Sequence, residues 1–230
     1  MNTFKQFYIE AKPPASVGKL ELHSTDVETA YKFASGVFDV DVEIPDFKEN
    51  YKSAKTHAQN GRTQRKDMPR ITSADVKLFQ QRLERGELDV SKPIAPSNRG
   101  NPFPEGLTGK QAKIWLSSGL NDGDPNDDIT SVKRKRVKIA DLLPIQKQIY
   151  VDTTLSSMAD VERSKIFLST KTFFIISADN YIIDGHHRYL SALLIDPNMK
   201  VNVVAIDLPI DILLKVAVSY GDAIGNKRNK

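Results

Sequence analysis

Two adjacent histidines near the C-terminus are flanked by a carboxylate, a glycine and an arginine, in the order Asp184, Gly185, His186, His187, Arg188. We call these five residues the box. Glycine lets the backbone approach an anion closely, and arginine and histidine donate hydrogen bonds to phosphate oxygens. The carboxylate suits a magnesium ligand, a base, or a group that orients His187 or Arg188. In combination these residue types favour a site that handles phosphate groups.

The residues around the box predict a strand, a sharp turn and a helix. Phe173–Ile176 and Tyr181–Ile183 are short apolar runs separated by turn-forming residues at 177–180, which predicts a tight β-hairpin. Beyond Gly185, apolar residues recur at helical spacing: Tyr189, Ala192, Leu193 and Ile195. The box therefore falls on the first turn of a helix, where free N–H groups and the helix dipole favour anions.

Each box residue also has a structural interpretation. Asp184 suits a helix cap, and it stands four residues before Arg188, which is the spacing of a helical ion pair. His186 and His187 lie about 100° apart around a helix, so they do not suit one metal ion together. We expect one ring to point into a cleft and the other to pack. A histidine at a helix N-terminus tends to lose its proton, which suits neutral hydrogen bonding or acid–base chemistry.

The run from Asp184 to Tyr189 resembles the signature of the ParB/sulfiredoxin superfamily. The resemblance extends upstream to Ile139–Gln146 and downstream to an expected strand at Val201–Asp207, and it covers about residues 132–220. Partition proteins carry Gly-Glu-Arg-Arg in this box and sulfiredoxins carry Gly-Cys-His-Arg. The Asp-Gly-His-His-Arg form is most similar to free serine kinases and to phage proteins labelled ParB-like nucleases. In all of these proteins the box binds nucleotide phosphates.

The resemblance implies a nucleotide-binding phosphotransferase that moves a phosphate to a small hydroxyl acceptor. The implied cofactors are Mg²⁺ and a nucleotide, which is ATP, ADP or CTP. Asp184 and His187 are the implied catalytic residues, and Asp184 is also the implied Mg²⁺ ligand. Nucleotide or phosphate binding is implied for the other site residues: Ser177, Gly185, His186 and Arg188. The kinases have their catalytic glutamate upstream of the box, where this chain has Gln146.

A second interpretation is a ParB-like nuclease or a nucleotide-gated DNA-binding protein. It is favoured by basic runs at 52–70, 133–138 and 225–230. The candidate nucleic-acid contacts are Lys133, Arg134, Lys135 and Arg136. For the run at 133–138 a localisation signal is another possibility, and an exposed edge strand protected by lysines is a third that needs no further assumption. The run at 52–70 is equally explained by a solvated loop that follows a helix. A third interpretation is a nucleotide sensor whose N-terminal half contacts a protein partner.

Composition narrows the class of protein. The chain has 230 residues, of which 40% are hydrophobic and 27% charged, as is ordinary for a soluble globular protein. The absence of cysteine excludes disulfides, sulfiredoxin chemistry and cysteine-ligated zinc. The absence of cysteine is consistent with a reducing setting, so we expect a cytoplasmic protein. No apolar run approaches the ~20 residues of a membrane span, so we expect no membrane partner. A net charge of +4 leans mildly towards polyanionic partners. The oligomeric state is not indicated.

The expected fold class is α/β, of the α+β kind. A small mixed-sheet domain of ParB/sulfiredoxin type is expected at 132–230, after a mostly helical N-terminal extension. Residues 1–107 form the helical region, with a Pro-rich connector at 90–107, and 108–131 form a helix and an acidic loop. The expected helices lie near 26–38, 46–58, 72–85 and 108–119, behind a cap at Thr154, and from Pro209 to Tyr220. The first strand is expected at Val137–Ile139. Asp122–Asp128 lacks EF-hand spacing and is expected to be a solvated acidic turn.

Overall fold

The computed structural model describes residues 19–37, 39–92, 109–124, 126–158 and 160–226. Its fold combines helices with one five-stranded mixed sheet, which confirms the expected α+β class. Two expected segments lie largely outside the described residues, namely the Pro-rich connector and the basic C-terminal tail. Among the described residues, no helix combines the length and the apolar character needed to cross a bilayer.

The sheet has the strand order β1-β5-β3-β4-β2. The strands are β1 (Val132–Lys138), β2 (Leu143–Pro144), β3 (Phe173–Ile176), β4 (Tyr181–Asp184) and β5 (Lys200–Ile206). The predicted hairpin is confirmed, because β3 and β4 pair antiparallel with Ile176 opposite Ile182. Its turn includes Asn180 at φ 63°, a left-handed conformation that asparagine tolerates well.

Strand β1 begins earlier than expected and includes the whole basic run. The expected strand at Val137–Ile139 was wrong in its limits, because Ile139 already belongs to a 3-10 turn. The strand lies first in the order of the sheet and its basic residues are exposed. This confirms the interpretation as an exposed edge strand, in which charged side chains discourage pairing with a second chain.

Contacts divide the chain into two units that are discontinuous in sequence. Unit 1 comprises Met1–Arg62, Arg136–Phe173 and Gly185–Asn202, and unit 2 comprises Thr63–Lys135, Phe174–Asp184 and Val203–Lys230. Both units thus contain segments from the N-terminal and C-terminal halves of the chain. The expected division at residues 107 and 131 stays a prediction.

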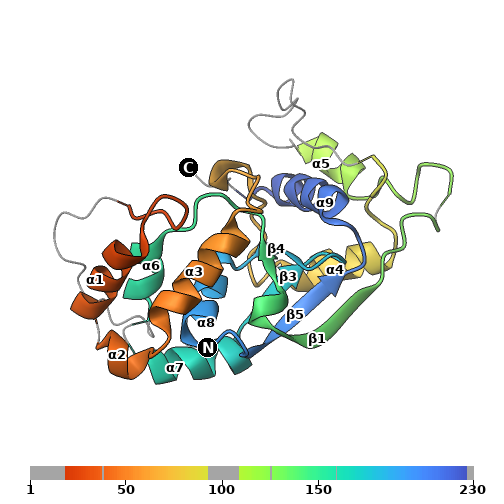
Figure 1. Ribbon diagram of the computed structural model, residues 1–230. Helices are drawn as coiled ribbons and strands as arrows, with labels where there is room; N and C mark the ends of the chain where they lie inside the picture. The colour runs from red at the N-terminus through yellow and green to blue at the C-terminus, as the bar shows by residue number, and fades with distance from the viewer. Residues whose placement is uncertain (1–18, 38, 93–108, 125, 159, 227–230) are drawn as a thin grey trace. The chain divides into compact units, whose positions relative to one another are not determined.

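Unit 1 is a helical cluster around α8. Its helices are α1 (Val27–Val37), α2 (Val40–Glu43), α3 (Phe47–Ala58), α6 (Val151–Ser156), α7 (Val161–Ile166) and α8 (His186–Ile195). Helix α8 packs against α3, α6 and α7, and α3 lies alongside it in Figure 1. The buried side chains that fill this cluster include Phe47, Tyr51, Leu155, Tyr189 and Leu193.

The expected helix capped by Thr154 was wrong. Thr154 lies inside α6, where its hydroxyl donates to the Tyr150 carbonyl oxygen at 2.8 Å. A separate helix, α7, is capped by Asp160, whose carboxylate accepts from the Arg163 N–H at 2.8 Å. The cap of α7 was thus expected at the wrong residue.

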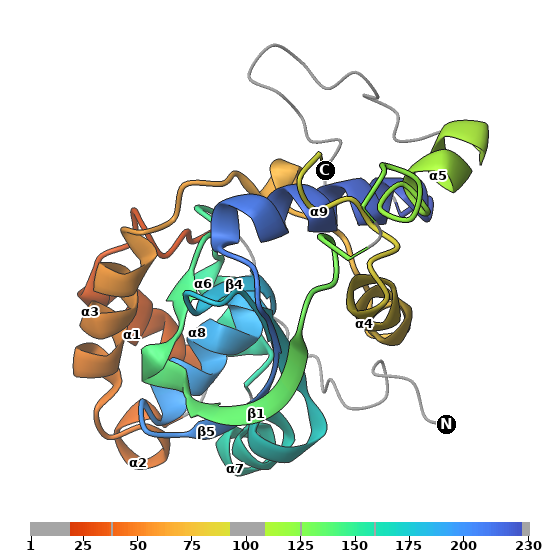
Figure 2. The same ribbon diagram turned by 90° about the vertical axis from the view of Figure 1, so that its right-hand side faces the viewer.

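Unit 2 contains α4 (Val76–Glu84), α5 (Gly109–Trp115), α9 (Ile210–Ala223) and most of the β3–β4 hairpin. Helices α5 and α9 lie side by side, as Figures 1 and 2 show. The Phe79 ring of α4 and the Tyr220 ring of α9 have centroids 4.6 Å apart. Helix α9 continues past Gly221, so the expected end at Tyr220 was wrong. A Cβ at Gly221 would lie 3.1 Å from the Arg70 carbonyl oxygen, so the glycine permits close packing inside the helix.

Candidate functional site

The box lies where β4 ends and α8 begins, as predicted. Gly185 is the N-cap residue of α8 and has φ 112° and ψ 20°, a left-handed conformation that glycine adopts without steric cost. The Tyr189 N–H donates to the Gly185 carbonyl oxygen at 2.7 Å, which closes the first turn of the helix. The first N–H groups of a helix have no partner inside it, and the dipole makes that end positive. This turn is therefore suited to an anion.

His186 is buried inside unit 1 and fastens a distant segment. Its exposed fraction is 5%, and its Nε2 accepts a hydrogen bond from the Gln146 backbone N–H at 3.2 Å. An acceptor at Nε2 requires the neutral ring with its proton on Nδ1. The packing that we expected for one histidine of the pair is thus found at His186.

His187 is only partly buried, but it contacts the same segment. Its Nε2 accepts from the Tyr150 backbone N–H at 3.2 Å, and its ring stacks against the Tyr150 ring with centroids 6.0 Å apart. The two histidines therefore hold two points of residues 146–150 against the start of α8. Because Nε2 of neutral His187 accepts this hydrogen bond, the ring proton lies on Nδ1.

Helix α8 is anchored to α3 by two long-range contacts. The Asn50 side chain donates to the Leu194 carbonyl oxygen at 2.8 Å, and the Tyr189 hydroxyl lies 2.6 Å from Nδ1 of His57. Burial lowers the pKa of His57 and raises that of Tyr189. Both shifts favour a neutral pair in which the hydroxyl donates to the ring nitrogen. Helix α8 is thus held to α3 near both of its ends by uncharged groups.

Asp184 and Arg188 fall in different units. Asp184 ends β4 in unit 2, whereas residues 185–188 belong to unit 1, and the side chains of Asp184 and Arg188 are both partly buried. Within unit 2, Asp184 lies opposite Ile175 at one end of the hairpin, and Ser177 lies at its other end. Ile175, the partner of Asp184, stands two residues before Ser177, which is about 7 Å along the strand. Ser177 and Asp184 are therefore not directly opposite each other in the hairpin, although both were expected in one phosphate site.

Ser177 instead meets two residues of the basic run. A pocket of about 180 Å³ in unit 2 is lined by Ser177, Lys133, Lys135 and Asp207, among others. The hydroxyl of Ser177 accepts from the Tyr181 N–H at 3.0 Å, so it also closes the hairpin turn. Since side chains alternate along a strand, Lys133 and Lys135 share the pocket side of β1.

Each of the two arginines of the basic run donates hydrogen bonds to residues of the unit to which it belongs. Arg134 donates to the Gln80 side-chain oxygen at 3.1 Å within unit 2. Arg136 belongs to unit 1, where it donates to the carbonyl oxygens of Ser169 and Lys200 at 3.2 and 2.8 Å. Of the four expected nucleic-acid contacts, the lysines are therefore the better placed to meet an external anion.

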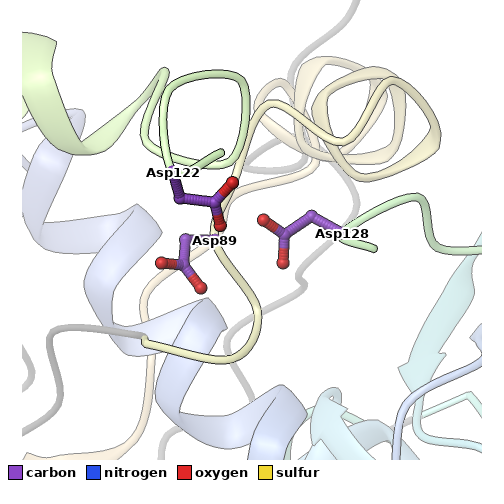
Figure 3. Close-up of side chains that lie close together, drawn as sticks. All are labelled: Asp89, Asp122 and Asp128. Carbon is purple, nitrogen blue, oxygen red and sulfur yellow. The ribbon is translucent and has the colours of Figure 1, made fainter. Parts of the chain in front are cut away.

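Sequence reasoning missed a group of three carboxylates in unit 2. Asp89, Asp122 and Asp128 each place one oxygen within 4.8 Å of the others, and they are the one such group of at least three His, Cys, Asp or Glu among the described residues. Figure 3 shows the Asp128 carboxylate pointing towards the other two. The expected solvated turn was wrong for Asp128, which is only 1% exposed, although Asp122 is exposed. Asp184, the expected Mg²⁺ ligand, is not part of this group.

Burial and charge act together on Asp128. Burial is the main cause that raises its pKa, and the neighbouring charges of Asp89, Asp127 and Asp122 add to this effect. One oxygen, Oδ1, accepts from the Val90 backbone N–H at 2.7 Å, which lowers the pKa and opposes these effects only in part. The three carboxylates thus place negative charges close together at a position where solvent screens them poorly.

No protein-family model, no curated protein and no solved structure matched the chain in our comparisons. Membership of the ParB/sulfiredoxin superfamily therefore stays a prediction, which rests on the box sequence.

Proposed function

We propose that the protein binds a nucleotide through its phosphates at the first turn of α8 and transfers a phosphoryl group to a small hydroxyl acceptor. The observation that carries this proposal is the left-handed Gly185 between β4 and the ten-residue α8. Glycine has no Cβ, so the backbone at this turn can approach a phosphate closely, and the N–H groups of a helix N-terminus favour anions. Phosphoryl transfer requires little covalent chemistry from the protein, and mainly needs positioning and charge stabilisation.

The proposal gives roles to the box residues other than His186. The N–H groups of the turn and the Arg188 guanidinium bind phosphate oxygens. Asp184 suits a magnesium ion, since Mg²⁺ beside phosphates is commonly held by one or two carboxylates; the ion would neutralise charge on the transferring phosphate. Asp184 accepts the proton of the acceptor hydroxyl as the acceptor oxygen bonds to phosphorus, or Nε2 of His187 accepts it after releasing the Tyr150 N–H. The bond from phosphorus to the leaving nucleotide oxygen breaks, and the electron pair leaves with the nucleotide.

Calorimetric titration of ATP, ADP and CTP, with and without Mg²⁺, tests the proposal. Arg188→Ala should weaken binding about 10- to 150-fold, because charge-assisted hydrogen bonds to phosphate contribute about 1.5–3 kcal/mol. Arg188→Lys should recover only part, since an ammonium cannot make the bidentate contact. The matched control is Arg163→Ala on α7, an exposed arginine of the same unit that should leave affinity unchanged.

Turnover separates binding from catalysis. His187→Ala should lower phosphoryl transfer to small hydroxyl acceptors more than it lowers nucleotide affinity, if the ring moves a proton. Full nucleotide affinity in a folded Arg188→Ala variant would refute the phosphate site. The box would then be a purely structural helix start.

The second candidate function is nucleic-acid binding, with or without nuclease activity. It is favoured by the exposed Lys133 and Lys135, which share one pocket on the edge strand. Such contacts to phosphates are electrostatic and little dependent on sequence.

Fluorescence anisotropy with single- and double-stranded DNA at several salt concentrations tests this candidate. Replacing Lys133 and Lys135 with glutamine should reduce the slope of log affinity against log salt by about 1.4 to 1.8. The matched control is the same change at Lys110 and Lys113, two exposed lysines of α5 in the same unit. Equal slopes in the two double variants would count against a specific contact by the edge strand.

A further inference from the structure

Three connecting segments of unit 2 converge around the acidic group. They are the segment after α4, the segment after α5 and the turn before β1. The Gly119 N–H donates to the Glu87 carbonyl oxygen and the Asp89 N–H to the Ser118 hydroxyl, both at 3.2 Å. The Val90 N–H donates to Oδ1 of Asp128 at 2.7 Å. These bonds hold together the segments that carry the carboxylates, and the last of them also orients the Asp128 side chain.

A second observation points to a ligand. Asp128 is 1% exposed, and among the described residues its Oδ2 has no hydrogen-bond partner. Its carboxylate points towards Asp89, which is itself only 4% exposed, and towards Asp122 (Figure 3). Within the described part of the chain, no Lys or Arg side chain forms an ion pair with any of the three. A buried carboxylate is costly unless it is paired or coordinates a metal.

We propose that Asp89, Asp122 and Asp128 bind a hard divalent cation, and that Ca²⁺ is the ion that fits. Carboxylate oxygens are the ligands that such ions prefer, and the chain has no cysteine to favour a softer metal. The three oxygens lie within 4.8 Å of one another, so one ion can contact all of them. Ca²⁺ accepts irregular coordination geometry, whereas Mg²⁺ demands a near-ideal octahedron and usually keeps several waters.

The bound ion would connect the three segments in addition to the hydrogen bonds described above. Its effect is therefore on the stability of unit 2, because a ligand that binds only the folded state raises the melting temperature by mass action. This site is independent of the box and of the proposed phosphoryl transfer.

The test uses the full chain, stripped with a chelator and then titrated with Ca²⁺ or Mg²⁺ up to about 1 mM. Calcium should raise the melting temperature progressively and give a binding isotherm by calorimetry, with a weaker response to magnesium. Asp128→Asn preserves the shape of the side chain and should weaken Ca²⁺ binding by about tenfold or more. Asp127→Asn is the matched control, since it removes the same charge from an exposed neighbour and should retain binding.

The variants also separate the proposal from a general charge effect. In chelator, Asp128→Asn should melt at or above the temperature of the unsubstituted protein, because it removes a buried charge beside Asp89. If Asp128→Asn does not fold, Asp122→Asn gives the same comparison at an exposed position. An unsubstituted protein that shows neither a melting shift nor a heat of binding with Ca²⁺ would overturn the proposal. A response to Mg²⁺ alone would overturn the assignment of Ca²⁺.

Discussion

Replacing His186 with phenylalanine should destabilise the protein by a predictable amount. The change removes the Nε2 acceptor of the Gln146 backbone N–H, and both residues are buried, with exposed fractions of 5% and 6%. Water cannot readily replace the lost acceptor, and a buried donor left unsatisfied costs about 1–3 kcal/mol. In a protein of this size each kcal/mol lowers the melting temperature by about 2–4 °C. The expected loss is therefore about 2–12 °C.

Two further variants separate hydrogen bonding from packing. His186→Gln places an amide oxygen near the position of Nε2 and should recover part of the lost stability. His187→Phe removes the acceptor of the Tyr150 N–H, but both of these residues are partly exposed, so water can take over. Its loss should be smaller, about 0.5–1.5 kcal/mol.

Thermal and urea unfolding, with hydrogen exchange at the Gln146 amide, measure these effects. Faster exchange at that amide in His186→Phe would place the loss at the expected bond. The reasoning is refuted if His186→Phe is as stable as the unsubstituted protein, or if His186→Gln loses as much as His186→Phe.

Two other predictions concern stability. Burial lowers the pKa of His57 below its ordinary value of 6.5, so the folded state binds this proton less tightly than the unfolded chain. The associated stability is present above about pH 6.5 and is lost as the pH falls through the lowered pKa. Melting temperatures measured from about pH 8 to about pH 5 should fall less in His57→Asn, and an identical fall would contradict this account. Gly119→Ala should destabilise unit 2 by about 1–3 kcal/mol, because its Cβ would lie 2.4 Å from the Gly86 carbonyl oxygen. Gly36→Ala is its control in urea unfolding, with nothing within 4 Å, and a similar stability of the two variants would argue against the clash.

The hairpin and α8 were predicted closely because their signals are local. Apolar runs of strand length flank a turn whose Asn180 adopts a left-handed φ of 63°, and Gly185 adopts φ 112° at the next change of direction. Both residue types accept such conformations more easily than others. Neighbouring residues alone therefore determine this part of the fold.

Two expected helix limits failed, the first because another residue nearby is the cap and the second at a tertiary contact. Thr154 has the chemistry of a cap, but its hydroxyl bonds inside α6, and Asp160 caps the next helix instead. Gly221 resembles a helix stop, but α9 continues through it because the backbone of Arg70 packs there. The preference of a residue for the end of a helix is worth about 1 kcal/mol, so packing contacts of similar free energy can outweigh it.

In the box, too, the local sequence predicted the backbone, whereas the tertiary structure decided the side-chain contacts. The order of its residues predicted a helix start with a glycine turn, and that part is confirmed. It did not indicate that His186 and His187 both accept N–H groups from residues 146–150. That segment is distant in sequence, so only the folded chain decides what each ring contacts.

The sequence by itself determined that Asp122–Asp128 is an acidic turn, because its composition is local. Only the tertiary structure decided that Asp128 is buried and that Asp89 joins it from another segment. Whether a carboxylate is solvated or needs a cation depends on its exposure and on the charges beside it. Both are set by segments that meet only when the chain folds, so spacing along the sequence cannot reveal them.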